Sequence, residues 1–556
     1  MTAFSAHATA GSDERLASLI AGGAAVAAER ARGHRGLMAM IKAAVVCSLN
    51  PASRWAGRSE PHQAALGWLG ELTAAQGLGG LFTSGDNVDS PPDSSFTLND
   101  LAGVHAQLMG RPEWSGVRTG LAEIAARAVD AIVTGGVHTP NHRWEIAAAL
   151  AGLARVTGDD RCTGRARQWL AEGVDADEDG IYSERSANYA AHVSNPSLLT
   201  LADALDEEPL REVVHRNLHA MIDLTDQGEV ETVHSRRQDQ RHRFSVGPFT
   251  MQWRRFAVAG CRPCARACLE AQTAPGFDPV DAVAQLLREP ELGADLETGD
   301  EPTVARTFAL GLRRRRDERQ MSTVYAGSDV PRAGRVASGL ACNPTVVRFR
   351  HGAALLDSVR LSRDFFGMGP FRPGTWREVG GGMLLIEELS TGYYQPLDPA
   401  QRRADGAYEL EFEGRFAAAM NFSRRQSDPV LLTTEMLVND VAGGIGLDLS
   451  FSGADVPFAV ELAFRPGGTL TGGRELGDGS VELVEGDAVY RVGDDEITVG
   501  PGRGSGLDRP PVYHPGEAYT FLGGTDALTG PRVYLTGRTS TPVSVTIRGR
   551  SDASAR

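Results

Sequence analysis

Apolar residues recur with a helical period through the first half of the chain, from residue 13 to about residue 290. Alanine and leucine fill most of the apolar positions, while arginine and glutamate fill the polar ones. Clusters of glycine and aspartate, such as Gly135-Gly136 and Asp177–Gly180, are typical breaks between helices. The pattern predicts helices over residues 13–32, 35–48, 60–76, 97–110, 116–134, 142–156, 160–172, 188–205, 208–224 and 247–272.

After about residue 321 the helical period is replaced by alternation of apolar and polar residues, as in residues 345–350, 446–451 and 543–547. Glycine, aspartate and proline turns separate these short segments at intervals of about 8–12 residues. Short alternating segments that continue to the end of the chain indicate an antiparallel β-sandwich with many strands.

Between the two halves lies an acidic stretch, Leu292–Pro302, followed by the arginine run Arg313–Arg316. We interpret both as a solvated linker face.

Paired helices joined by polar, glycine-rich loops are typical of an α/α toroid. We therefore predict an α+β multidomain fold: a flexible tail over residues 1–12, an α/α toroid (an incomplete barrel of helical hairpins) over 13–320, an antiparallel β-sandwich over 321–550 and a frayed tail over 551–556.

Chain length, net charge and lysine content limit the number of domains, the partners and the mechanisms to be considered. A chain of 556 residues exceeds what one hydrophobic core supports, which favours two domains. A net charge of −15 argues against nucleic acid or an anionic membrane as partner, so an acidic substrate would need a local basic cluster. Lys42 is the only lysine, which leaves Schiff-base and phosphate-loop mechanisms without a further candidate.

Six cysteines in a chain of this length do not make a disulfide framework. Cys261, Cys264 and Cys268 fall at i, i+3 and i+7, on one face of a predicted helix. Three thiolates joined by His242 or His234 would suit zinc. Small buried residues on a helix are the preferred interpretation, so we predict neither a metal nor a cofactor.

Two stretches carry the candidate chemistry. Pro140–Glu145 places Asn141 and His142 at the mouth of a predicted helix, and Glu184–Tyr189 does the same for a phenol some forty residues later. Abstraction of a proton beside a carboxylate requires a donor that neutralises the carboxylate, a base, and an acid for the leaving oxygen. Asn141 suits the first role, and His142 or Tyr189 the other two.

Each of these residues also has an ordinary structural interpretation. Asn141 at a helix start is typical of an N-cap. A lone histidine such as His142 is usually on the surface, and a lone tyrosine such as Tyr189 belongs to a core or its rim. Their joint appearance at loop-to-helix junctions of one predicted domain favours function.

The stretch Asn141-His142-Arg143-Trp144 resembles the Asn-His-Gly-x-Trp signature of the heparinase II/III-like and alginate lyase families. Asp179–Ser186 followed by Tyr189 resembles their second segment, in which an acidic-glycine stretch and a Glu-Arg pair precede the catalytic tyrosine. The resemblance implies a toroid followed by a sandwich and a carbohydrate lyase. Arg143 stands where many members have glycine, and the His-rich sandwich motif of heparinase II/III-type proteins is not found.

Further residues are assigned to substrate binding. Arg143, Trp144, Glu184 and Arg185 flank the catalytic candidates, and Arg185 can clamp a substrate carboxylate.

A second polar cluster, residues 233–243, contains Arg236 and Arg237, which can bind a uronate bidentately, and Asp239. His234 in this cluster is a second candidate for the base or the carboxylate neutraliser. A solvated loop is the alternative interpretation.

In the second half, the aromatic stretch Tyr393-Tyr394 suits stacking on sugar rings. Core or interface packing explains it equally well.

The leading hypothesis is a lyase that cleaves a uronic-acid-containing oligo- or polysaccharide by β-elimination. A glycoside hydrolase using two of Glu145, Glu184 and Asp239, about 5–10 Å apart, is the first alternative. A non-catalytic carbohydrate-binding protein is the second. The N-terminus has no secretory pattern, so we expect a cytoplasmic protein without a membrane or nucleic-acid partner, and the sequence leaves a homo-oligomer open.

Overall fold

The computed structural model describes residues 2–85, 87–299, 303–329, 343–408, 421–477, 479–504, 518–519, 524–525 and 528–551. The chain divides into two compact units. The helical unit comprises Met1–Val230 and Phe244–Asp300, and the sheet unit comprises Glu231–Arg243 and Glu301–Arg556. Within the described residues, no helix is both long and apolar enough to cross a membrane.

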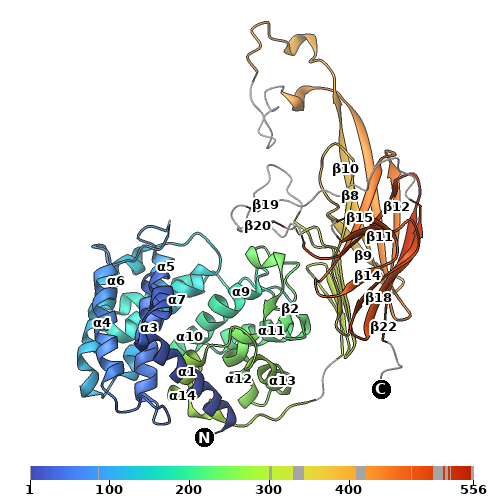
Figure 1. The fold of residues 1–556 in the computed structure, drawn as a ribbon. Coiled ribbons are helices and arrows are strands. Elements are labelled where there is room, and N and C mark those ends of the chain that lie inside the picture. The colour runs from blue at the N-terminus through green and yellow to red at the C-terminus, as the bar shows by residue number, and fades with distance from the viewer. Residues whose placement is uncertain are drawn as a thin grey trace. The chain divides into compact units, whose positions relative to one another are not determined.

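The helical unit contains the helices coloured blue to green in Figure 1. Their bounds are α1 Ala3–Ala21, α2 Ala24–Ala31, α3 His34–Leu49, α4 Glu60–Ala75, α5 Pro91–Gln107, α6 Ser115–Thr134, α7 His142–Thr157, α8 Asp160–Leu170, α9 Ala187–Tyr189, the π-helical turn η2 Ala190–Ser194, α10 Asn195–Leu205, α11 Glu208–Leu224, α12 Thr250–Val258, α13 Arg262–Ala271 and α14 Pro279–Arg288. A small sheet joins β1 Thr225–Asp226, β2 Glu229–Val230 and β3 Phe244–Ser245.

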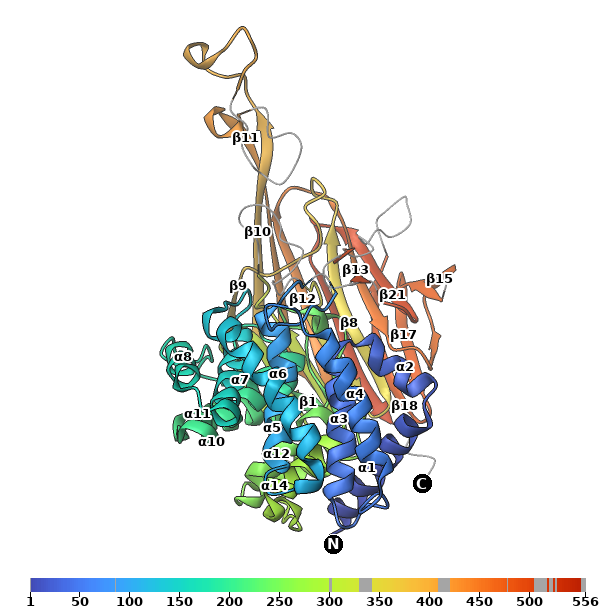
Figure 2. The same ribbon diagram turned by 90° about the vertical axis from the view of Figure 1, so that its left-hand side faces the viewer.

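The helices pack as neighbours along the chain, with α3 against α4, α5 against α7, and α12 against α13. Figure 2 shows α3, α4, α5 and α6 running lengthwise beside one another. The array closes because α1 packs on α14, and Lys42 of α3 forms ion pairs with Asp100 of α5 (2.8 Å) and Asp281 of α14 (2.9 Å). The predicted α/α toroid is confirmed.

The beginning of the chain differs from the prediction of a loose tail. Helix α1 starts at Ala3 and buries Phe4 and Ala8, because apolar residues at helical spacing continue to the N-terminal end. The predicted helix 13–32 is interrupted at Gly22 and Gly23, whose φ values of 80° and 68° only glycine adopts readily.

The sheet unit contains two large antiparallel sheets within its described residues (Figure 1). One sheet runs β14-β17-β18-β22-β12-β11-β10-β9, and the other runs β15-β16-β21-β13-β8-β7-β6-β5-β4, with β16 and β21 parallel. The bounds are β4 Val304–Phe308, β5 Leu312–Arg316, β6 Gln320–Tyr325, β7 Val347–His351, β8 Ala354–Arg363, β9 Thr375–Val379, β10 Gly382–Tyr394, β11 Ser427–Val441, β12 Gly444–Gly453, β13 Pro457–Phe464, β14 Thr469–Thr471, β15 Arg474–Gly477, β16 Ser480–Glu482, β17 Glu485–Val492, β18 Asp495–Arg503, β19 Ala518–Tyr519, β20 Gly524–Thr525, β21 Arg532–Arg538 and β22 Val543–Ser551.

One contiguous core connects the sheets. It contains Phe349 and Leu361 from one sheet and Leu385 and Ile547 from the other. Strands β12 and β13 contribute alternate residues to this core, as the period of two requires. The predicted antiparallel β-sandwich is confirmed.

The arginine run Arg313–Arg316 is part of strand β5, not a solvated linker. Arg313 and Arg314 are 6% and 0% exposed, and each has an acidic partner: Asp440 for Arg313 at 2.6 Å and Glu231 for Arg314 at 3.6 Å. Successive arginines of a strand point to opposite faces, so some of them are buried. A buried arginine needs an acidic partner, and the sequence pattern does not show these partners. The sheet unit therefore begins near residue 301 and not at 321.

Candidate active site

Asn141 immediately precedes α7. It occupies the N-cap position, but its backbone is helical (φ −65°, ψ −26°) and its side chain makes no capping hydrogen bond. The side chain is directed elsewhere: its Nδ2 donates to Glu184 Oε2 at 2.6 Å, and its Oδ1 accepts from Thr139 Oγ1 at 3.2 Å. The N-cap interpretation therefore does not describe what this amide does.

The hydrogen bond to Glu184 determines which way the Asn141 amide is turned. An ionised carboxylate only accepts hydrogen bonds, so the amide atom facing it is the nitrogen. Asn141 is 2% exposed and Glu184 is 8% exposed, so this contact lies in a site largely shielded from water. The second N–H of Asn141 is thereby fixed in direction.

Tyr189 is placed by the segment that begins at Glu184. Arg185 has φ 53°, a left-handed conformation that is uncommon outside glycine and often marks functional turns. Ser186 then caps α9, its Oγ accepting from the backbone N–H of Tyr189 at 3.1 Å. Tyr189 is half-buried and directly precedes the π-helical turn η2, a feature enriched at functional sites.

A buried polar network anchors this segment. Tyr182 donates to Asn195 Oδ1 (2.7 Å), Asn195 donates to Asn217 (3.0 Å), and Asn217 donates to the carbonyl of Gly180 (2.9 Å). Burial raises the pKa of Tyr182, which holds its proton in the bond to Asn195. Of the two phenols, Tyr189 is thus the one available for chemistry.

Gly180 approaches the backbone of α11 closely. A Cβ at this position would stand 2.7 Å from the carbonyl carbon of Arg216, and its φ is 85°. Only glycine allows this contact. In the acidic-glycine stretch identified in the sequence, Gly180 therefore allows the turn to pack closely on α11.

His142 opens α7 and is half-buried. Its ring meets the edge of His138 at a centroid distance of 5.0 Å and that of Phe96 at 6.5 Å. His192 lies exposed in η2, three residues after Tyr189, and its ring meets that of Phe244 edge to face at 6.0 Å.

Arg143 and Trp144 support the start of α7. Arg143 forms ion pairs with Glu172 and Asp175, each at 3.0 Å, and its guanidinium lies 4.5 Å from the centre of the Trp144 ring. Trp144 is 1% exposed, so its ring is packed inside the helical unit. The structure brings Asn141 and Glu184 together, and the roles of Arg143 and Trp144 in substrate binding stay predictions.

Glu145, a candidate carboxylate for hydrolysis, is enclosed. It is 4% exposed, and its two oxygens accept from Asn99 Nδ2 (2.6 Å) and Ser197 Oγ (2.9 Å). Burial raises its pKa to about 7, and the bonds from Asn99 and Ser197 only partly oppose this. Glu145 is therefore held by hydrogen bonds inside the helical unit.

We expect Glu145→Gln to change how stability depends on pH. Between pH 4.5 and about 7 the folded protein keeps a proton on Glu145 that the unfolded chain releases. This contribution to stability is present at low pH and is lost as pH rises through that interval, by an amount on the order of 3 kcal/mol. Denaturant unfolding at several pH values should show Glu145→Gln gaining stability relative to the wild type as pH rises. The exposed Glu123→Gln is the matched control, and a constant difference for Glu145→Gln would contradict the expectation.

Residues 231–243 belong to the sheet unit. Glu231 is 0% exposed and accepts from Arg348 and from Thr323 (3.1 Å), as well as from two backbone N–H groups that follow it. Burial opposes its ionisation, but Arg348, Arg243 and Arg314 outweigh burial and hold its pKa well below the usual range. This buried charge cluster fixes the segment to strands β5, β6 and β7.

The predicted site residues of this segment are largely internal. His234 and Asp239 are 2% and 3% exposed, and Asp239 accepts from Ser235. Arg236 forms a bidentate pair with Asp329 at 2.8 and 2.9 Å, and Arg237 is half-buried. Their roles in substrate binding stay predictions.

Arg348→Met should destabilise the sheet unit by about 2–3 kcal/mol, because it leaves the Glu231 carboxylate buried with fewer cations. Arg314 still faces that carboxylate, which keeps the loss below that of a wholly unpaired charge. Chemical unfolding of the full chain measures the change. Arg315→Met, whose side chain is 48% exposed, is the control and should cost below about 1 kcal/mol. Equal losses for the two variants would refute the importance of this cluster.

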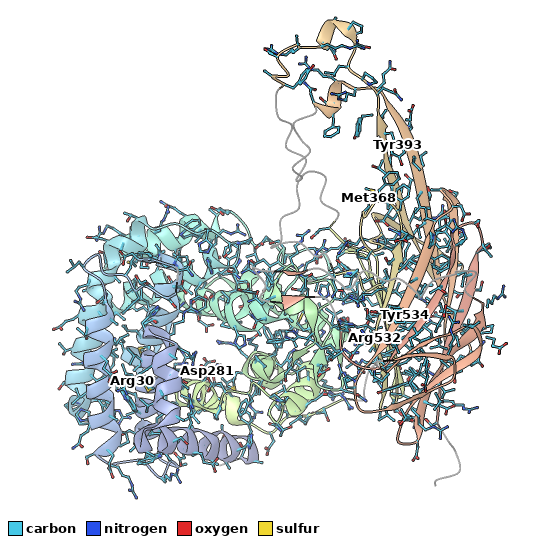
Figure 3. All side chains as sticks on the ribbon, turned by 45° about the horizontal axis from the view of Figure 1, so that its top comes forward. Arg30, Asp281, Met368, Tyr393, Arg532 and Tyr534 are labelled. Atoms are coloured by element: carbon cyan, nitrogen blue, oxygen red, sulfur yellow. The ribbon has the colours of Figure 1, made fainter. Side chains whose placement is uncertain are left out.

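Tyr393 and Tyr394 end β10, the long strand paired with β11. Tyr393 lies on the elongated part of this ribbon (Figure 3), is 67% exposed and meets Phe366 edge to face at 5.8 Å. Tyr394 is 38% exposed and packs on Phe422. The exposed ring of Tyr393 suits a sugar face, and this role stays a prediction.

No family model and no curated protein sequence matches the chain. Among solved structures it is similar to a xanthan lyase of Paenibacillus (TM-score 0.54, 10% identity, covering 94% of this chain and 54% of that one). It is also similar to chondroitin AC lyase of Streptomyces coelicolor A3 in complex with chondroitin sulphate (0.50, 13%, 99% and 80%) and to a mutant heparan sulfate lyase of Pedobacter heparinus (0.50, 11%, 94% and 77%). The chain has the α/α toroid and β-sandwich fold of these polysaccharide lyases.

Proposed function

We propose that this protein is a carbohydrate lyase that cleaves a uronate-containing oligo- or polysaccharide by β-elimination. The observation that carries the proposal is the 2.6 Å hydrogen bond that orients the Asn141 amide against Glu184, five residues before Tyr189. The fold shared with three polysaccharide lyases supports it.

Asn141 neutralises the substrate carboxylate. Removal of the neighbouring proton moves negative charge onto that carboxylate, and a pre-oriented N–H donor stabilises the charge without reorganising. Glu184 takes one N–H of the amide, and the other N–H serves the substrate. Asn141 is 2% exposed, so little water competes with the uronate carboxylate for its second N–H.

Tyr189 acts as base and then as acid. In its deprotonated form the Tyr189 phenolate takes the proton from C5 of the uronate, the C4–O bond breaks as the C4–C5 double bond forms, and the proton then passes from the Tyr189 hydroxyl to the leaving oxygen, which restores the phenolate. His142 is the alternative base at the same helix mouth. Arg185 supplies positive charge beside Glu184, which an acidic substrate requires in a protein with a net charge of −15.

The hydrolase alternative has weaker support. Both oxygens of Glu145 are engaged by Asn99 and Ser197, and Glu184 is engaged by Asn141. A pair of carboxylates for glycoside hydrolysis needs one to protonate the leaving group and one to activate water or attack the sugar. Asp239, the third candidate, accepts from Ser235, so each candidate carboxylate is engaged by a hydrogen bond within the protein.

The test is ultraviolet absorbance during incubation with uronate-containing oligosaccharides. Elimination conjugates a new double bond to the carboxylate, which absorbs where the substrate does not. A rising signal on at least one member of a panel drawn from chondroitin, heparan sulfate and xanthan supports the proposal. New reducing ends without absorbance would replace it with hydrolysis. Sugar binding without either product would replace it with a carbohydrate-binding function.

A further inference from the structure

Four potential metal ligands converge in the helical unit, and none of them is a residue assigned to catalysis. They are His215 and His219 of α11, Cys261 at the N-cap of α13, and Cys264 in its first turn. Their ligand atoms all lie within 4.8 Å of one another. Cys264 is buried, and the other three residues are half-buried.

The distances match a tetrahedral cation site. The Nε2 atoms of His215 and His219 are 3.1 Å apart, and each lies 3.4 Å from Cys261 Sγ. With zinc–nitrogen and zinc–sulfur bonds of about 2.0 and 2.3 Å, the ligand atoms of a tetrahedral site stand about 3.3–3.8 Å apart. The observed triangle is close to one face of that tetrahedron.

Hydrogen bonding among these groups explains the triangle poorly. Each imidazole Nε2 offers a single direction in the ring plane, as either a donor or an acceptor. If His215 and His219 use this direction for each other, neither has it left for Cys261. A cation at the centre accepts a lone pair from all of them at once.

The local structure also suits ligation. Histidines four residues apart lie on one face of a helix, and cysteines three apart do the same. Phe256 stacks on His215 at 4.5 Å and fixes its ring. Both thiols lie at the N-terminal end of α13, facing the two histidines of α11.

We propose that His215, His219, Cys261 and Cys264 bind one structural zinc ion that fastens α11 to α13. Binding replaces the two thiol protons, which pass to solvent, and the two imidazoles coordinate in their neutral form. Four protein ligands complete the coordination, as in structural zinc sites. The proposal departs from the sequence prediction of no metal, because α11 contributes the two histidines that the sequence analysis did not pair with these cysteines.

The first measurement is the metal content of the purified full chain by atomic emission spectrometry. We expect one zinc per chain in the wild type and a loss of at least about tenfold in Cys261→Ser and in His219→Ala. Cys268→Ala is the matched control, because Cys268 lies one turn farther along α13 and contacts Arg254 (3.9 Å). It should retain zinc. Equal zinc in wild type and Cys261→Ser would overturn the proposal.

A second measurement uses only the wild-type protein, so its outcome does not depend on whether the variants fold. The wild-type protein is stripped with a chelator under reducing conditions and titrated with Co²⁺. Thiolate-to-cobalt charge transfer with intense visible bands indicates tetrahedral ligation by sulfur and nitrogen and supports the site. Absence of these bands, or a Cys261–Cys264 disulfide in the isolated protein that takes up no metal after reduction, overturns it in favour of a redox dithiol.

Discussion

Tyr189→Phe is expected to abolish turnover while the protein stays folded. The Tyr189 phenolate takes the proton and the resulting phenol returns it, so loss of this oxygen should lower kcat by about 10³- to 10⁴-fold. The backbone N–H of Tyr189 donates to Ser186 Oγ, and removal of the Tyr189 hydroxyl leaves this hydrogen bond in place. The measurement is the initial rate of ultraviolet absorbance on the substrate found by the panel, with circular dichroism to establish folding.

Tyr182→Phe is the matched control. It removes a hydroxyl seven residues away, but that hydroxyl donates to buried Asn195 and takes no part in the reaction. It should cost about 1–2 kcal/mol of stability and leave measurable turnover. If Tyr189→Phe keeps near-normal turnover, the base and acid must be sought elsewhere, first at His142.

Asn141→Ala should lower kcat by about 10²- to 10³-fold, the usual cost of removing one pre-oriented donor to a developing charge. It also leaves Glu184 without its Asn141 donor, which should cost about 1–3 kcal/mol of stability. Rates are therefore compared well below the melting temperature. Binding of a non-cleavable uronate oligosaccharide should weaken much less than kcat falls, since the donor acts mainly on the transition state.

Glu184 distinguishes the lyase from the hydrolase. In the proposed lyase Glu184 orients Asn141, and the amide oxygen of Glu184→Gln can still accept from Asn141 Nδ2. Glu184→Gln should then retain clearly more activity than Glu184→Ala. If Glu184 were a catalytic acid or nucleophile, both variants would be equally inactive. This second pattern would reject the positioning role.

The sequence by itself determined the order of the architecture. Helical periodicity followed by alternation is a local property, and it predicted most helices of the first unit, including α7 and α11. It also located Asn141 and Tyr189 at helix starts, because proline, serine and glycine mark such junctions. Breaks at Gly22-Gly23 and Gly260 were missed, because apolar residues continue at helical spacing on both sides of each break.

Only the tertiary structure decided what the polar residues face. Glu184 is the partner of Asn141 across 43 positions, and His215 and His219 meet Cys261 across more than 40. Arg314 is buried in a strand because Glu231 lies beside it. Periodicity reports which residues share a face of one element, but a contact between distant elements depends on how they pack. The identity of a charge's partner, and hence its chemistry, therefore appears only in the folded chain.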